Sequence, residues 1–172
     1  MRNTAHPVIR WFRHLFTGTL AVRRAFPKAV MDQITEAVRS CESHHAGEIR
    51  FVIEAALEPR ELWAGLTSRE RALDVFSRLR VWDTEHNNGV LIYLLYADHA
   101  VEIVADRGVG NGRVDPAEWQ TACERMREEF RAGRYAAGAI AGIETVADVL
   151  ARHASERPDI GNEMPDAPVI LR

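Results

Sequence analysis

The run from Val90 to Tyr96 constrains the fold of this chain more than any other stretch. It reads Val-Leu-Ile-Tyr-Leu-Leu-Tyr, which is apolar throughout, has the length of a strand and is rich in residues that favour strands. Such a run is typical of a strand that is covered on both faces. We therefore predict a central strand over residues 89–96, in a sheet of three or four strands that is sandwiched by helices.

The residues that follow this run indicate a β-hairpin. Residues 97–100 form a short polar break, and residues 101–105 then alternate between two faces, as expected of a partner strand nearer the edge. In an antiparallel pair, the end of the second strand lies beside the start of the first. Asp106 and Arg107 are therefore predicted to lie near the polar loop of residues 83–88, and Asp98 at the opposite end of the sheet.

This polar cluster is the leading candidate for a functional site. Its acidic and amide side chains offer the hard oxygen ligands that Ca²⁺ or Mg²⁺ prefer, and an arginine there could bind a phosphate. Asp83 and His86 are the candidates for moving a proton. The predicted metal ligands are Asp83, Glu85 and Asp106, and the predicted ligand contacts are Thr84, Asn87, Asn88 and Arg107. We expect no organic cofactor.

Two other interpretations of the polar residues stay open. Asp, Thr and Asn are also standard turn residues, so the loop could be purely structural. In addition, open α/β sheets usually bind ligands beyond the carboxyl ends of parallel strands, which favours Glu54, Glu58 and Asp98. We choose the end with Asp106 because it concentrates more oxygen ligands.

The segment before the hairpin indicates a strand, a helix and a return to the central strand. Residues 48–55 alternate apolar and polar side chains, which predicts a strand. A loop containing Pro59 and Trp63 follows, and the capping-box spacing from Thr67 to Glu70 predicts a helix over residues 68–80. A crossover through that helix makes the two strands parallel, so the antiparallel hairpin makes the sheet mixed.

Two helices and a tail are predicted after the hairpin. Asp115 and Pro116 form a strong helix start, Gly133 ends that helix, and residues 135–152 form another. The spacing of Gly138 and Gly142 would let the second helix approach a neighbour closely. Residues 154–172 are predicted to be a tail, in which residues 169–171 add an edge strand or an apolar plug.

The N-terminal segment, residues 1–26, is predicted to be basic and amphipathic. Residues 1–30 contain six Lys and Arg residues and no acid, so a net charge of −3 leaves about −9 on the rest. The apolar stripe of a short helix here could dock on its own domain or, through residues 1–25, make weak contact with an anionic membrane surface. The sequence has no spanning run and no signal-peptide h-region, and we expect a cytoplasmic protein with a second, peripheral location at the membrane surface.

Composition limits the remaining classes. A chain of 172 residues with 47% hydrophobic and 27% charged residues fits one domain, here residues 27–153, with short end segments. Cys41 and Cys123 lack metal-ligand spacing, so reduced thiols are expected. An acidic body without a basic, aromatic-lined groove argues against nucleic-acid binding.

Several segments in order resemble the TPM domain family. They are the helix 68–80, the run from Trp82 to Tyr93, residues 101–108, and residues 130–135 before a small-residue helix. Residues 162–166, Asn-Glu-Met-Pro-Asp, are similar to the tail of the soluble bacterial branch. The resemblance implies a three-layer α/β/α sandwich with a small mixed sheet and a C-terminal helical pair. It also implies functions reported for some members, acid-phosphatase activity and divalent-metal binding.

Three functions are consistent with these observations. The preferred one is a TPM-like module that binds a divalent metal, an unknown protein or a small ligand without catalysis. The second, which the resemblance suggests, is a metal-assisted acid phosphatase that acts on phosphomonoesters. The third is a peripheral membrane-associated protein that uses the basic N-terminal helix.

Overall fold

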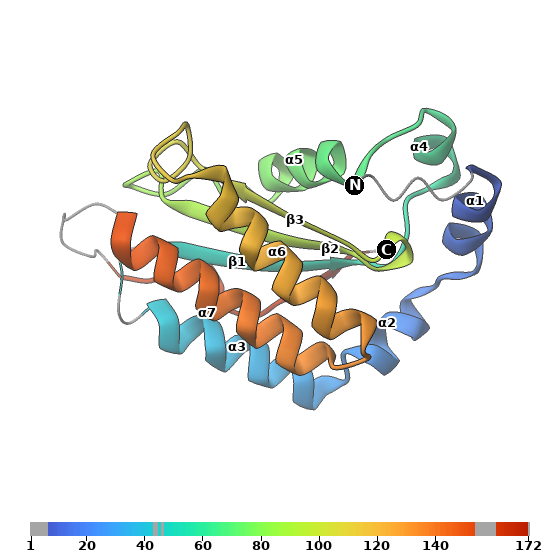
Figure 1. The fold of residues 1–172 in the computed structure, drawn as a ribbon, viewed down its shortest axis with the longest axis horizontal. Coiled ribbons are helices and arrows are strands. Elements are labelled where there is room, and N and C mark those ends of the chain that lie inside the picture. Colours follow the sequence, from blue (N-terminus) through green and yellow to red (C-terminus); the bar gives the residue numbers. More distant parts are fainter. Residues whose placement is uncertain (1–6, 43–44, 46, 154–160, 172) are drawn as a thin grey trace.

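A computed structural model, which describes residues 7–42, 45, 47–153 and 161–171, places a four-stranded mixed sheet at the centre of the molecule (Figure 1). The strands are β1 (Glu48–Glu54), β2 (Gly89–Leu95), β3 (Ala100–Ala105) and β4 (Val169–Leu171), in the order β3-β2-β1-β4. β2 is parallel to β1 and antiparallel to β3. The predicted central strand, hairpin and mixed sheet are therefore confirmed.

The hairpin has the register that the sequence pattern requires. Val90 pairs with Ala105 and Leu95 pairs with Ala100, and every residue of β2 is buried. A single 3₁₀ turn, η1 (Tyr96–Asp98), connects the strands, and His99 closes it in the left-handed conformation with φ of 50°. The apolar run is thus continuous because β2 meets a helical layer on each face.

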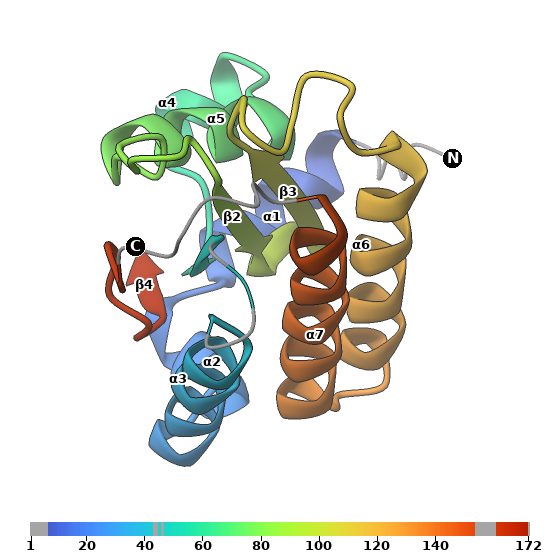
Figure 2. The same ribbon diagram turned by 90° about the vertical axis from the view of Figure 1, so that its left-hand side faces the viewer.

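Helices cover both faces of the sheet (Figure 2). α3 (Lys28–Glu42), α6 (Pro116–Arg131) and α7 (Tyr135–His153) cover one face, where alternate strand residues such as Phe51, Ile92 and Ile103 join one apolar core. α4 (Pro59–Trp63) and α5 (Ser68–Arg78) cover the other face, where Val52 and Leu91 join a second core. The structure is therefore the predicted three-layer α/β/α sandwich.

α6 and α7 form the predicted C-terminal helical pair. Asp115 caps α6 by accepting a hydrogen bond from the Ala117 N–H at 2.9 Å. A Cβ atom at Gly138 or Gly142 would press on Phe130 or on Met126 of α6. The small residues of α7 therefore allow its close approach to α6, as their spacing predicted.

One loop of the prediction is a helix in the structure. Residues 59–63 form the short helix α4, because Pro59 occupies its first turn and Glu58 and Glu61 form a capping box. In this box the Glu58 N–H donates to Glu61 Oε2 at 2.8 Å. Proline suits the first turn of a helix as well as a loop, so Pro59 is compatible with either structure.

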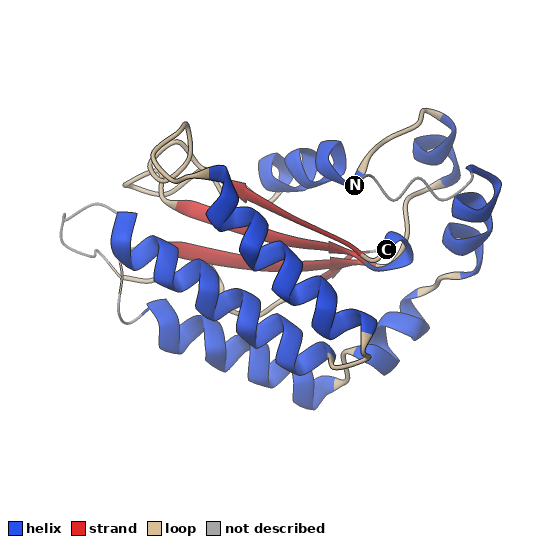
Figure 3. Cartoon of the chain, viewed as in Figure 1, coloured by secondary structure: helices blue, strands red, loops and turns tan. Residues whose placement is uncertain are grey.

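Both ends of the described chain pack on the sandwich (Figure 3). α1 (Pro7–Phe16) and α2 (Thr19–Ala25) lead into the domain, and Val22 and Phe26 are fully buried in its larger core. At the other end, β4 adds to β1 in parallel, which confirms the edge strand predicted for residues 169–171. Within the described ranges, no helix combines the length and apolar composition needed to cross a membrane.

We predict that Leu94→Asp unfolds the domain. Leu94 is 2% exposed in the central strand, and a buried charge without a partner costs several kcal/mol against a total stability of about 5–15 kcal/mol. The matched control is Leu73→Asp, because Leu73 is 48% exposed on α5. Circular dichroism during thermal unfolding measures whether each variant is folded. The Leu73→Asp control should be folded and the Leu94→Asp variant should be unfolded. A folded Leu94→Asp variant would contradict the central position of β2.

Candidate functional site

The loop between α5 and β2 is a compact turn with a buried polar core. Thr84 and Asn88 are 7% and 1% exposed. The Asn88 N–H donates to Thr84 Oγ1 at 3.1 Å, and the Asn87 N–H donates to the Thr84 carbonyl at 3.1 Å. Asn87 is left-handed, with φ of 53°, a conformation that Asn adopts more readily than most residues. The hydroxyl of Thr84 thus stabilises the turn, as the turn interpretation predicted.

The loop after β3 lies directly against this turn. Arg107 Nε donates to Asn87 Oδ1 at 2.8 Å, and the Gly108 N–H donates to the Asn87 carbonyl at 2.6 Å. The Asp106 N–H donates to the Gly89 carbonyl at 2.9 Å and continues the β2–β3 ladder. The structure therefore confirms the predicted meeting of the two loops, which lie at the opposite end of the sheet from α1 (Figure 1).

Asp106 has the least satisfied carboxylate in this arrangement. Its Oδ1 accepts a hydrogen bond from the Arg107 N–H at 2.7 Å. Its Oδ2 is buried and has no hydrogen-bond partner among the described residues. Burial of a charged oxygen without a donor is unfavourable, so native proteins usually give such an atom a hydrogen bond or an ion.

The other two predicted metal ligands do not join Asp106 in a three-carboxylate group. Asp83 and Glu85 are exposed on the turn, and His86 is half-buried beside them. Among the residues that the structure describes, no group of three or more His, Cys, Asp or Glu side chains is placed to hold a metal ion. The strand directions bring the two loops together, but they do not turn these three carboxylates toward one point.

Two acidic residues that sequence reasoning missed, Glu48 of β1 and Glu163 of the C-terminal tail, connect the tail to this end of the sheet. Glu48, which is 4% exposed at the start of β1, accepts hydrogen bonds from the Glu163 and Met164 N–H groups at 3.1 Å each. Glu163 Oε2 in turn accepts a hydrogen bond from the Glu85 N–H at 2.9 Å. The tail therefore runs past the candidate loop. The one sequence signal for this contact is Glu48, a glutamate at the start of an otherwise buried strand.

The opposite end of the sheet contains a buried ion pair. Arg71 of α5 donates to both carboxylate oxygens of Glu54, with Nη2 2.6 Å from Oε1 and Nε 2.9 Å from Oε2. The Tyr93 hydroxyl donates to Glu54 as well. The hydrogen bonds that Arg71 donates to Glu54 raise the pKa of Arg71, and burial raises the pKa of Tyr93. Glu54 is therefore occupied by partners within the chain.

Asp98 at the same end anchors α1. Its carboxylate lies 3.0 Å from Arg10 Nε, 3.2 Å from Arg13 Nη2 and 3.1 Å from His14 Nε2. Burial alone would raise the pKa of Asp98, but His14 and Arg10 outweigh burial and lower it. The carboxyl ends of β1 and β2 are thus used for internal contacts, which leaves the Asp106 end as the better candidate site.

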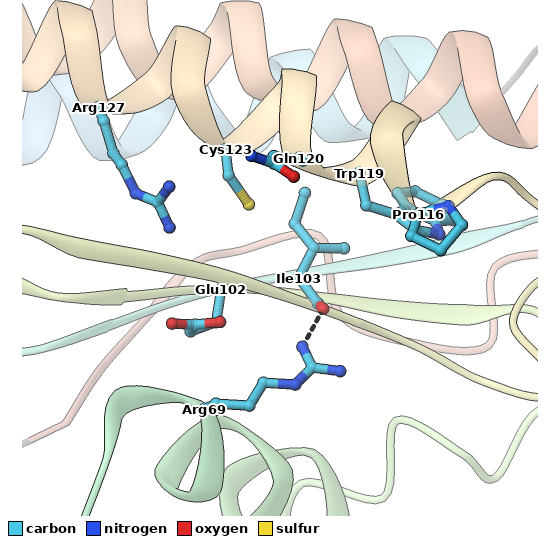
Figure 4. Close-up of a pocket in the computed structure, with 8 residues that line it drawn as sticks. All are labelled: Arg69, Glu102, Ile103, Pro116, Trp119, Gln120, Cys123 and Arg127. Atoms are coloured by element: carbon cyan, nitrogen blue, oxygen red, sulfur yellow. Dashed lines mark hydrogen bonds between the residues drawn. The ribbon is translucent and has the colours of Figure 1, made fainter. Parts of the chain in front are cut away.

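A pocket of about 340 Å³ lies at the open edge of β3, between α5 and α6 (Figure 4). Arg69 donates to the Ile103 carbonyl, and Arg127 Nη2 donates to the Val101 carbonyl at 2.5 Å. Burial raises the pKa of the Cys123 thiol, which lines the pocket, to about 11. The two arginines cap carbonyls of an edge strand and protect it from pairing with another chain. No local sequence signal marks this pocket, because it depends on how two helices flank one strand.

Comparison with known proteins identifies relatives of this fold. The family model described as the TPM domain matches residues 23–149. The solution structure of the BA42 protein from the psychrophilic bacterium Bizionia argentinensis is 30% identical, with a TM-score of 0.71, and the match covers 83% of this chain and 92% of that one. The N-terminal domain of a protein from P. gingivalis is 23% identical, with a TM-score of 0.53 and coverage of 72% and 76%, and shares the fold. No curated protein matches the chain.

We predict that Gly108→Ala destabilises the joined loops. A Cβ atom at this position would overlap the carbonyl oxygens of His86 and Asn87, so backbone must move, at a cost of about 1–3 kcal/mol. Gly18→Ala is the control, because no atom lies within 4 Å of a Cβ built there. Urea unfolding measures both free energies, and equal values for the two variants would contradict the close contact at Gly108.

We also predict that the docking of α1 depends on the charge of Asp98. Folding lowers the pKa of Asp98. Its contribution to the stability of the folded protein is therefore complete at a pH above the pKa of an ordinary Asp, about 3.9. That contribution is lost as the pH falls through the lower pKa of Asp98 in the folded state. At neutral pH, Asp98→Asn should speed amide hydrogen exchange in α1, and Asp32→Asn, on the exposed surface of α3, should not. Unchanged exchange in Asp98→Asn would show that apolar contacts alone hold α1.

Proposed function

This chain belongs to the TPM domain family, and on that basis we propose that it is a non-catalytic module that binds a divalent cation, Ca²⁺ or Mg²⁺, at the Asp106 end of its sheet. The cation would connect the module to an anionic small ligand or to a partner protein. The observation that carries this proposal is the buried Oδ2 of Asp106, which has no hydrogen-bond partner among the described residues.

The proposed site combines one carboxylate with one amide oxygen. Mg²⁺ in proteins is commonly held by one or two carboxylates together with water, so a group of three acidic side chains is not required. Asp106 would provide the charged ligand, and Asn87 would provide a nearby amide oxygen. The exposed carboxylates of Asp83 and Glu85 would attract a cation to this end of the molecule through their charge.

Arg107 gives the site a preference for an anionic group on the ligand. Its side chain is exposed, and its Nε bonds Asn87 Oδ1 at 2.8 Å, which holds the guanidinium beside the Asp106 loop. A guanidinium at this place can pair with a phosphate or carboxylate, while Asp106 holds a cation. A ligand with an anionic group that also coordinates the cation would satisfy both side chains.

The residues of the site favour binding over catalysis. The two loops, residues 81–89 and 106–110, contain neither serine nor cysteine that could act as a nucleophile. A metal-assisted phosphatase would have to use a bound water as its nucleophile, with Asp83 or His86 to move the proton. Hydrolysis of a phosphomonoester therefore requires an activated water and a proton carrier at this site, whereas binding requires neither.

We predict that Asp106→Asn weakens cation binding at least about tenfold, since one contact between opposite charges near a protein surface is worth about 1–4 kcal/mol. Isothermal titration of the metal-free protein with Ca²⁺, Mg²⁺ and Mn²⁺ measures this change. Asp148→Asn, an exposed change on α7, is the control and should bind as the unchanged protein does. Equal affinities of the two variants, or no binding by the unchanged chain, would refute the proposed site.

The same protein samples test the alternative function. Incubation with p-nitrophenyl phosphate and the cation that binds should release no nitrophenol above the level given by the cation alone. Turnover that is lost in Asp83→Asn or His86→Gln would replace the binding module with a phosphatase. Turnover that persists in both variants would indicate a contaminating enzyme and would leave the titration result as the deciding one.

A further inference from the structure

The first two helices expose an unusual amount of apolar surface. Six large apolar side chains of α1 and α2 are between 55% and 78% exposed, namely Val8, Ile9, Phe12, Leu15, Phe16 and Leu20. The rings of Phe12 and Phe16 stack on each other with their centroids 6.2 Å apart. Contiguous exposed apolar residues of this kind commonly mark a site of interaction with a membrane or another protein.

The apolar side of α1 is exposed because the polar side of the helix is the one that docks. Arg10, Arg13 and His14 contact Asp98, and Arg10 Nη2 also donates to the Leu66 carbonyl at 2.8 Å. The Leu57 N–H donates to the Nδ1 of the buried His14 at 2.9 Å. A rotation of α1 that buried its phenylalanines would break all of these contacts. Trp11 of the predicted apolar stripe packs on the second core as expected, but the other large apolar side chains of α1 face away from the domain.

The charge around this surface selects one class of partner. The described residues 7–30 contain five Lys and Arg residues and no acid. Arg10 and Arg13 share the single carboxylate of Asp98, and Lys28 pairs with Asp32 of α3. Arg23 and Arg24 are exposed on α2, the helix that also carries the exposed Leu20. A second copy of the chain would fit poorly in a two-fold contact, because such a contact sets the same cationic surface against itself. An anionic surface that also accepts apolar side chains is complementary.

From these observations we infer that α1 and α2 form a docking surface for an anionic lipid bilayer. The exposed apolar side chains of residues 8–20 would enter the boundary between headgroups and acyl chains, and Arg23 and Arg24 would lie near the lipid phosphates. The contacts of Asp98 fix the orientation of α1, so that the apolar side is presented to the bilayer. This inference is independent of the proposed cation site, since Asp106 lies at the other end of the sheet.

Flotation of the intact chain with vesicles tests this inference. The vesicles are phosphatidylcholine alone, or phosphatidylcholine with about 30% phosphatidylserine, in buffer without divalent cations. The chain should float with the anionic vesicles, float far less with the neutral ones, and be released by high salt, because each basic residue near an anionic surface contributes about 1 kcal/mol.

Two pairs of variants separate the apolar and the charged contributions. Phe12→Glu with Phe16→Glu should lower vesicle binding at least about tenfold, and the control Leu73→Glu with Trp82→Glu, at exposed positions elsewhere, should not. Arg23→Glu with Arg24→Glu should lower binding to anionic vesicles by a similar factor, whereas Arg60→Glu with Arg78→Glu should have little effect. Thermal unfolding verifies that each variant is folded.

Three outcomes would overturn the inference. The first is the absence of flotation with anionic vesicles. The second is equal loss of binding in the apolar pair and its control. The third is a combination of two results: the unchanged chain does not float with vesicles, and it sediments as a dimer. In that case the double variant Phe12→Glu with Phe16→Glu would sediment as a monomer. That third result would assign the surface to a second copy of the chain.

Discussion

The pairing of β2 with β1 on one side and with β3 on the other is the constraint on which the rest of this structure depends. Because β2 is buried on both faces, helices must cover the sheet from both sides. Because β1 and β2 are parallel while β3 returns, each end of the sheet brings a fixed set of loops together. The candidate site and the anchored helix α1 are two consequences of these strand directions.

The two ends of the sheet satisfy their acidic residues in different ways. Glu54 and Asp98 at one end have arginine or histidine partners from α5 and α1. Asp106 at the other end has a buried oxygen without a hydrogen-bond donor among the described residues. The usual position for a ligand in a parallel sheet is thus filled by internal ion pairs. The contacts of Asp98 also fix α1 with its exposed apolar side chains outward.

Much of the fold was predictable because its signals are local. The apolar run of β2, the capping box from Thr67 and the helix start at Asp115 each depend on a few neighbouring residues. The meeting of Asn87 and Arg107 was also predictable, because it follows from the antiparallel direction of the hairpin. The family model and the similar solved structures agree with this architecture.

The remaining features depend on contacts between distant segments. The contact of Glu163 with the Glu85 loop joins residues far apart in sequence, and the pocket beside β3 requires α5 and α6 to lie on either side of one strand. The docking of α1 through Arg10, Arg13 and His14 depends on Asp98, which the pattern of α1 alone does not reveal. For the same reason, strand direction could place Asp83, Glu85 and Asp106 at one end but could not predict that they do not form a three-carboxylate group.

The most direct test of the account is a titration of the ¹⁵N-labelled chain with Ca²⁺ or Mg²⁺, followed by amide NMR spectra. If the cation binds at the Asp106 end, chemical-shift changes will be confined to residues 84–89 and 106–110 and to the tail near Glu163. Changes concentrated instead at residues 54–58 and 96–99 would place the site at the carboxyl ends of the parallel strands. Spectra that do not change with either cation would contradict the claim altogether.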